Sequence, residues 1–359
     1  MDHHDFEKTL NKAVESEISA EEALLLLRES WFSPNRTLEL FKAACEVRRS
    51  FLNDEVALFV CLGPHRVCKL DPLCRYCWVN VPEGGWDEEG VVKPDEAAQA
   101  LEELYSHHNI STPYVWVGGG SDLKSSGKDI VNYVTGLRDI IKRWRLKPTL
   151  SGLPYIDVTN LKELKELGIC EVACPFETLN EEVFRETKPG DDLKMRMEEA
   201  KLAEKAGIGF AGGFMVGIHY LVNPSFSLDK VLKEYVDHIF MLRRLRTLTC
   251  ILVYAFNPLP GIPLADKPRE IDLNVARVGA LTRLVCKHID VDICTNSLEL
   301  SLISGASRVS FGFIQLAKKP RPWRLTSLVK AFKVGPLHAV SYQDHVLRCI
   351  RGMDLRVRA

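Results

Sequence analysis

Eight short apolar segments recur along the chain, and nearly all of them are followed by an amphipathic stretch with helical spacing. The first segment is the run Val56 to Leu62. Parallel strands need long crossover connections, usually helices, so this alternation predicts a parallel sheet. Eight such units over about 260 residues predict a (β/α)8 barrel of the TIM type.

The other elements follow from the same periodicities. Strands are predicted near 56–62, 114–117, 148–151, 169–174, 208–215, 250–255, 291–294 and 308–311. Helices are predicted near 94–105, 129–144, 160–167, 192–206, 228–245, 270–288 and 298–304.

Two helices are predicted before the first strand. Ser19-Ala-Glu-Glu22 has the pattern of a capping box, in which serine and glutamate satisfy free backbone N–H groups. A second helix is predicted from Thr37, with an apolar stripe at Leu40, Ala44, Val47 and Phe51. The chain is therefore divided into an N-terminal helical extension (1–54), the barrel (55–314) and a basic C-terminal extension (315–359).

Composition limits the classes of function. The 359 residues are 46% hydrophobic with a formal net charge of -1, as in an ordinary globular protein. The charge gives no general reason to expect nucleic acid, and no apolar run approaches the roughly 20 residues of a membrane span. Ten basic against two acidic residues follow position 314, which fits an anionic partner or a solvated basic surface.

The eleven cysteines indicate a reducing environment. They follow no regular disulfide spacing and no signal peptide precedes them, which predicts a cytoplasmic protein with metal chemistry. Cys170 and Cys174 are expected on one face of a strand as small buried residues. A mostly structural role is expected for Cys45, Cys61, Cys250, Cys286, Cys294 and Cys349.

Three further cysteines, Cys68, Cys74 and Cys77, follow the first predicted strand in a loop. Three thiolates are one fewer than a closed tetrahedral or cubane site needs. If they hold four irons, one iron keeps an open position for a small chelating molecule. A structural zinc site completed by His65 or a distant cysteine is the alternative interpretation.

The loop resembles the radical S-adenosylmethionine (SAM) superfamily, whose usual spacing is C-x3-C-x2-C with an aromatic residue before the last cysteine. Tyr76 occupies the aromatic position, but five residues separate Cys68 from Cys74. The resemblance implies that Cys68, Cys74 and Cys77 bind a [4Fe–4S] cluster and that SAM is cleaved there to a 5′-deoxyadenosyl radical. It also implies a small-molecule substrate and an electron donor such as ferredoxin or flavodoxin.

Further motifs of the family fall at the carboxyl ends of predicted strands. Gly118, Gly119 and Gly120 stand where the family has Gly-Gly-Glu, which receives the SAM amino group. The glutamate is absent here, so carbonyls with Ser121 or Asp122 would replace it. Three glycines also occur in plain tight turns.

Three more positions complete the implied SAM site. Glu177 corresponds to the carboxylate that binds the ribose hydroxyls, and Arg196 to an arginine that binds the SAM carboxylate in the related [FeFe]-hydrogenase maturase. Met215 corresponds to an apolar contact of the adenine. The alternative for Arg196 is a solvent-facing residue of a charged helix.

The rest of the chain, from about Ser19 to Phe313, resembles the biotin synthase group. Ala211 stands where biotin synthase has a cysteine for its sulfur-donating cluster, so sulfur insertion is not expected. A chain like that of biotin synthase with a C-x5-C-x2-C loop resembles a small group of radical SAM proteins in methanogens. That group helps build the pyridinol precursor of the iron-guanylylpyridinol cofactor of [Fe]-hydrogenase. Another radical SAM maturase or mutase, or a non-catalytic zinc scaffold, are the alternatives.

Overall fold

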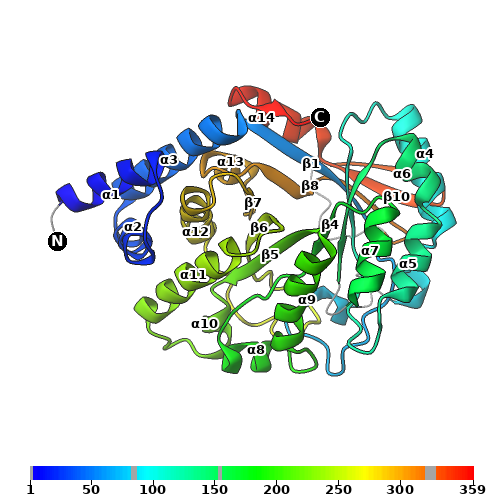
Figure 1. Cartoon of the computed structure of the whole chain (residues 1–359), viewed down its shortest axis with the longest axis horizontal. Helices are drawn as coiled ribbons and strands as arrows, with labels where there is room; N and C mark the ends of the chain where they lie inside the picture. Colours follow the sequence, from blue (N-terminus) through cyan, green and yellow to red (C-terminus); the bar gives the residue numbers. More distant parts are fainter. Residues whose placement is uncertain (1–2, 82–86, 153–155, 320–328) are drawn as a thin grey trace.

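A closed barrel of parallel strands forms the centre of the computed structural model, which describes residues 3–81, 87–152, 156–319 and 329–359. Strands β1 to β8 pair in sequence order, and β1 also pairs with β8 (Figure 1). They are β1 (Glu55–Leu62), β2 (Tyr114–Val117), β3 (Lys147–Ser151), β4 (Glu171–Ala173), β5 (Gly209–Val216), β6 (Leu248–Ala255), β7 (Asp290–Cys294) and β8 (Arg308–Ala317). The predicted (β/α)8 barrel is confirmed.

Helices connect the strands around the outside of the barrel (Figure 1). They are α4 (Pro94–His107), α5 (Lys128–Thr135), α6 (Arg138–Arg143), α7 (Val158–Glu166), α8 (Glu181–Thr187), α9 (Leu193–Ala206), α10 (Ile218–Val222), α11 (Leu228–Arg243), α12 (Asp272–Val285) and α13 (Leu298–Ile303). The single helix predicted over 129–144 is wrong, because the helix is interrupted at Gly136, between α5 and α6. A Cβ there would lie 2.5 Å from the Cβ of Pro94, and glycine is also a weak helix former.

Three helices precede the barrel: α1 (His3–Glu15), α2 (Ala20–Phe32) and α3 (Pro34–Leu52). The predicted capping box is present, with Ser19 and Glu22 each bonded to the other's backbone N–H. Leu40, Ala44 and Val47 are buried as the apolar stripe predicts. Helices α2 and α3 pack against α11 and α12 on one side of the barrel (Figure 1). Helix α1 was not predicted.

The C-terminal residues add a hairpin, a helix and a short strand: β9 (Lys330–Val334), β10 (Leu337–Ser341), α14 (Gln343–Gly352) and β11 (Arg356–Val357). Strand β10 pairs antiparallel with residues 314–317 of β8, so the end of β8 lies between β1 and β10. Strand β11 pairs with the start of β1. The division predicted after residue 314 falls within β8, and residues 320–328 of the predicted extension lie outside the described residues.

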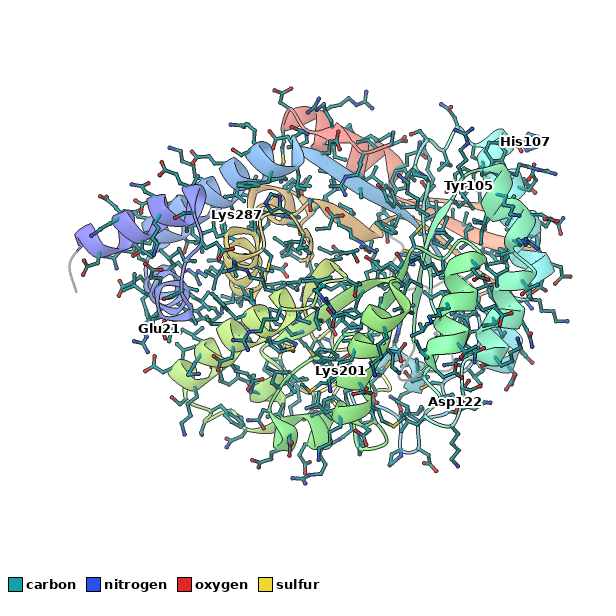
Figure 2. The ribbon with its side chains drawn as sticks, viewed as in Figure 1. Glu21, Tyr105, His107, Asp122, Lys201 and Lys287 are labelled. Atoms are coloured by element: carbon teal, nitrogen blue, oxygen red, sulfur yellow. The ribbon has the colours of Figure 1, made fainter. Side chains whose placement is uncertain are left out.

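The helices turn polar side chains outward and apolar ones toward the sheet. Glu21 on α2 and Lys201 on α9 are exposed, and they lie on the outer faces of their helices (Figure 2). A single large apolar cluster fills the space between helices and strands. In the described part of the chain, no helix has the length and apolar character that crossing a bilayer requires.

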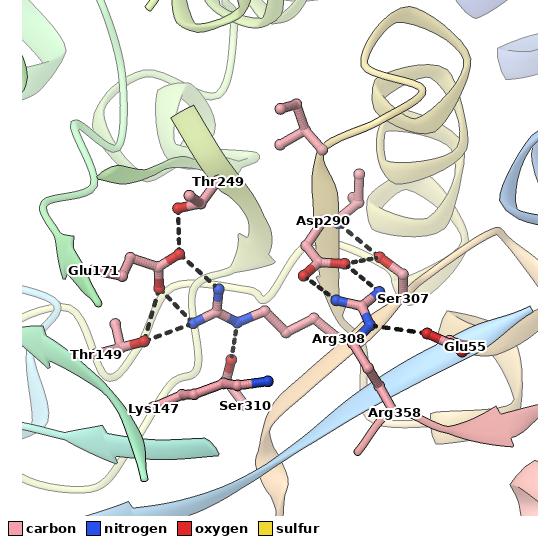
Figure 3. A network of polar contacts seen from close by, with 12 residues as sticks. Glu55, Lys147, Thr149, Glu171, Thr249, Asp290, Ser307, Arg308, Ser310 and Arg358 are labelled. Atoms are coloured by element: carbon pink, nitrogen blue, oxygen red, sulfur yellow. Dashed lines mark hydrogen bonds and ion pairs between the residues drawn. The ribbon is translucent and has the colours of Figure 1, made fainter. Parts of the chain in front are cut away.

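A buried ion pair closes the amino end of the barrel. Arg308 at the start of β8 donates to both carboxylate oxygens of Glu171 at the start of β4, over 2.7 and 3.0 Å (Figure 3). Its guanidinium also lies 4.2 Å from the centroid of the Phe59 ring. A two-pronged pair of this kind offsets the large cost of burying both charges. The floor of the barrel is therefore polar but fully bonded.

Replacing Glu171 with glutamine should destabilise the fold strongly, because the charge of Arg308 would remain buried without its carboxylate. We expect the free energy of unfolding to fall by about 3–5 kcal/mol in guanidinium titrations of the cluster-free protein. Glu198→Gln is the matched control, since its pair with Lys201 is exposed and should contribute less than about 1 kcal/mol. Equal effects of the two changes would contradict this account of the floor.

Candidate active site

One cavity of about 400 Å³ opens at the carboxyl ends of the strands, as expected for this architecture. All ten residues predicted for the site line it, although they come from five separate stretches of sequence. These are Cys68, Cys74, Tyr76, Cys77, Gly118, Gly119, Gly120, Glu177, Arg196 and Met215. The structure thus brings the predicted residues together, while their individual roles stay predictions.

The cysteine loop is held by backbone hydrogen bonds rather than by secondary structure. Between Cys74 and Cys77 the chain makes a turn, and the side-chain amide of Asn80 donates to both of their carbonyls over 2.7 and 2.9 Å. Burial raises the pKa of the Cys74 thiol to about 12, against the opposing charge of Lys188, and it also raises the pKa of Cys77. Binding of a metal by these thiols would therefore release protons.

The three glycines after β2 are needed for the close approach of two backbone segments. The N–H of His65 donates to the carbonyl of Gly118 over 2.8 Å, and the N–H of Gly120 donates to the carbonyl of Arg66 over 3.0 Å. A Cβ on Gly119 would overlap the His65 ring, and one on Gly120 would overlap the backbone of Cys68. The glycines therefore let the cysteine loop lie directly on the end of β2.

Glu177 lies after β4 in the left-handed region, with φ at 62°, which is uncommon for a residue with a side chain. Its carboxylate accepts hydrogen bonds from Lys188 over 2.7 Å and from the Tyr254 hydroxyl over 3.2 Å. Lys188 is fully buried and was not predicted. No sequence pattern marks it, because it lies on a connection between helices rather than at a strand end.

Arg196 is buried, so the alternative of a solvent-facing residue is wrong. It pairs with Asp191 over 2.6 Å, and it donates to the Pro175 carbonyl over 3.1 Å and to the Ser121 hydroxyl over 3.4 Å. Burial disfavours the Asp191 carboxylate, but the charges of Arg196 and Lys188 outweigh this and lower its pKa. The guanidinium is thus fixed at the edge of the cavity beside the glycines.

Of the two residues considered as substitutes for the missing glutamate, Ser121 lines the cavity and Asp122 does not. Asp122 instead pairs with Lys69 over 3.2 Å and accepts from the N–H of Lys124. Ser121 therefore remains the better candidate beside the glycines.

Tyr76 and Met215 meet in an apolar cluster beside the cysteines. This cluster also contains the buried side chains of Val81, Ile218 and Phe256. Met215 is 2% exposed, and its N–H donates to the carbonyl of Glu177 over 2.9 Å. The cluster forms an apolar wall next to the polar network of Glu177.

The cavity extends well beyond the predicted residues. Its far walls include Trp78, Trp116, Tyr254, Cys294, Phe311, Gln315 and, from the C-terminal hairpin, His338 and Val340. Cys61 and Cys294, expected to be structural, also line it. Position at a strand end could have marked Cys294, but the hairpin residues carry no motif and only the pairing of β10 with β8 brings them to the cavity.

The expectation for Cys170 and Cys174 is wrong in part. Strand β4 covers only Glu171–Ala173, so both cysteines lie outside it. Cys170 is exposed, whereas Cys174 is buried and contacts Arg196.

The donor set of the cysteine loop fits an iron–sulfur cluster better than a single zinc ion. Zinc ligands in tetrahedral sites lie about 3.3–3.8 Å apart. Within the described ranges, the thiols of Cys68, Cys74 and Cys77, alone or with His65, do not form a set of three donors that all lie within 4.8 Å of one another. His65 is turned away toward the Ser151 carbonyl, 3.4 Å from its Nε2. Wider spacing suits a cubane, in which each thiolate binds a different iron.

Comparison with known proteins finds a family match over part of the chain. Residues 63–223 match the family model of the radical SAM superfamily, and this range contains all ten predicted site residues. The chain is thus an enzyme with a radical SAM domain. Members of this superfamily use a [4Fe–4S] cluster and SAM, which confirms the predicted cofactors. The non-catalytic zinc scaffold is therefore set aside.

Several relatives of this radical SAM enzyme cover most of its length. It is 26% identical to uncharacterized protein MJ0785 of Methanocaldococcus jannaschii over 82% of this chain and 74% of that protein. Biotin synthase of Syntrophus aciditrophicus is 27% identical over 73% of this chain and 75% of that protein. The [FeFe] hydrogenase maturase subunit HydE of Thermotoga maritima is 23% identical over 71% of this chain and 68% of that protein. The enzyme is thus related to biotin synthase and to a hydrogenase maturase.

A solved structure shares the fold over nearly the whole chain. Methylornithine synthase (PylB) superposes with a TM-score of 0.74 at 16% identity, covering 98% of this chain and 97% of that one. At this identity the likeness concerns the fold alone.

Replacing Cys74 with alanine should abolish cluster binding, because two thiolates cannot hold the cubane that three hold. After anaerobic reconstitution, we expect iron and sulfide to fall from about four of each per chain to near zero, with loss of the brown absorbance near 400 nm. Cys286→Ala is the control, since Cys286 is buried at the end of α12 away from the cavity. Full iron content in Cys74→Ala would refute the ligand assignment.

Proposed function

We propose that this radical SAM enzyme makes the pyridinol precursor of the iron-guanylylpyridinol cofactor of [Fe]-hydrogenase, the role of the protein called HcgA or HmdB. The observation that carries the proposal is the C-x5-C-x2-C loop on a barrel related to biotin synthase and HydE. The longer first gap distinguishes this loop from the usual C-x3-C-x2-C spacing of the superfamily.

The interior of the barrel supports a reaction other than sulfur insertion. Ala211 on β5 is fully buried among Phe59, Trp116 and Leu252, and it has no thiol to hold a second cluster. Its neighbour on β6, Cys250, is fully buried in the same cluster. The floor below is occupied by the ion pair of Arg308 and Glu171.

The bound cofactors would supply the reductive cleavage of SAM to methionine and a 5′-deoxyadenosyl radical. In this proposal Cys68, Cys74 and Cys77 hold the cluster, and an electron donor such as ferredoxin or flavodoxin reduces it. The carbonyls of Gly118–Gly120 and the guanidinium of Arg196 receive the amino and carboxylate groups of SAM. Glu177 binds the ribose, and Tyr76 and Met215 contact the adenine.

The remaining walls of the cavity suit a compact, planar substrate. Trp78, Trp116 and Phe311 supply aromatic faces, and Tyr254, Gln315 and His338 supply polar atoms. Aromatic walls with a few polar groups favour a small ring system over a long polymer. This supports a small-molecule substrate and is compatible with a pyridinol precursor.

Arg196→Lys should weaken SAM binding without removing the cluster. Lysine keeps the positive charge beside Asp191 but lacks the two parallel donors that match a carboxylate. Loss of hydrogen bonds to a charged group predicts a dissociation constant for SAM about 10–100 times higher, measured by equilibrium binding to the reconstituted protein. Arg185→Lys on α8, whose side chain is exposed, is the control. Unchanged affinity for SAM in Arg196→Lys would contradict its assignment.

The product can be tested in a methanogen that normally makes [Fe]-hydrogenase but from which the gene for this step has been deleted. This chain should restore [Fe]-hydrogenase activity, and Cys74→Ala should not. Supply of the pyridinol itself should restore activity in both cases. If the chain cleaves SAM in vitro but fails to restore activity, the enzyme is a maturase or mutase for another product.

A further inference from the structure

A second group of metal-binding side chains lies outside the cavity, where α13 contacts α14. Glu299 is in the first turn of α13, and His345 and Cys349 lie four residues apart on α14. Residues at this spacing point from the same face of a helix. Among the described residues, these three form the one set of three such donors whose atoms all lie within 4.8 Å of one another.

The distances within this group are close to those expected around one small ion, and two of them are slightly longer. The Sγ of Cys349 lies 3.4 Å from Oε1 of Glu299, and Nε2 of His345 lies 3.7 Å from the same oxygen. Sγ lies 3.8 Å from the imidazole nitrogens. Bond lengths of about 2.0–2.3 Å to a tetrahedral zinc ion give separations of about 3.3–3.6 Å between ligand atoms.

The carboxylate is already oriented for this role. The hydroxyl of Ser297, which caps α13, donates to Oε2 of Glu299 over 3.1 Å. This leaves Oε1 to face His345 and Cys349. Hydrogen bonds that orient the ligands from outside are typical of metal sites in proteins.

The mixed donor set selects among metals. A thiolate and an imidazole exclude magnesium and calcium, which prefer oxygen ligands only. One thiol cannot hold an iron–sulfur cluster. Zinc takes sulfur, nitrogen and oxygen ligands in proteins, and three such side chains leave a fourth position for water.

We propose that Glu299, His345 and Cys349 form a zinc site that fastens α14 to α13. Helix α14 directly follows β10, which carries His338 and Val340 in the wall of the cavity. It precedes β11, which pairs with β1. Zinc would thus fix the C-terminal segment where it completes the cavity, at a point distinct from the cysteine loop. This site is independent of the proposed substrate.

Zinc binding can be measured on the reconstituted holoprotein, in which the cluster occupies Cys68, Cys74 and Cys77. We expect wild type to bind one Zn²⁺ per chain in competition with a chromophoric chelator. Cys349→Ser and His345→Gln should each weaken the affinity at least about tenfold while iron content stays unchanged. Cys170→Ser, which removes an exposed thiol elsewhere, is the control and should bind zinc as wild type does. X-ray absorption should show one sulfur at about 2.3 Å from the zinc in wild type.

Two results would overturn the proposal. One is a holoprotein that binds no zinc, which would leave the three side chains as a hydrogen-bonded contact between helices. The other is zinc bound with equal affinity by wild type, Cys349→Ser and His345→Gln, which would place the ion elsewhere. His345→Gln retains the thiol, so the test remains decisive if Cys349→Ser folds poorly.

Discussion

Pairing of β1 with β8 is the interaction on which the rest of the structure depends, because it joins strands about 250 residues apart and turns an open sheet into a barrel. The buried pair of Arg308 and Glu171 lies at the amino end of this closure and links β8 to β4 across the interior. With the floor filled, the other end of the barrel is left for ligands. The position of the cavity is thus a consequence of how the barrel closes.

At the carboxyl end, contact between backbones sets the geometry. The cysteine loop has no helix or strand of its own around the thiols, and it takes its shape from hydrogen bonds to the glycines after β2. A side chain at Gly119 or Gly120 would separate the two segments. The same glycines therefore position the thiols and form part of the cavity wall. The buried chain of charges from Glu177 through Lys188 and Asp191 to Arg196 fixes the neighbouring part of the wall.

Most of the barrel and the cysteine side of the cavity could be predicted from the sequence. Period-two apolar runs mark strands, and in a parallel barrel all strand ends meet at one face, so motifs such as Gly118–Gly120 and Glu177 converge without further information. Lys188 and the hairpin residue His338 could not be predicted in this way. They reach the cavity through tertiary contacts, namely a buried ion pair and the pairing of β10 with β8, which leave no periodic trace in the sequence.

The arrangement around β8 means that two distant parts of the sequence enclose the cavity. In the described part of the chain, β7 pairs with β8 at one position only, Asp292 opposite Arg308. Farther along β8, residues 314–317 pair with β10 instead. The residues that match the superfamily, 63–223, end long before this hairpin begins. The stretch that matches the superfamily contains all ten predicted site residues, while a later segment of the same chain adds His338 and Val340 to the enclosure of the cavity. A change in the hairpin would therefore reshape one wall of the cavity without altering the cysteine loop.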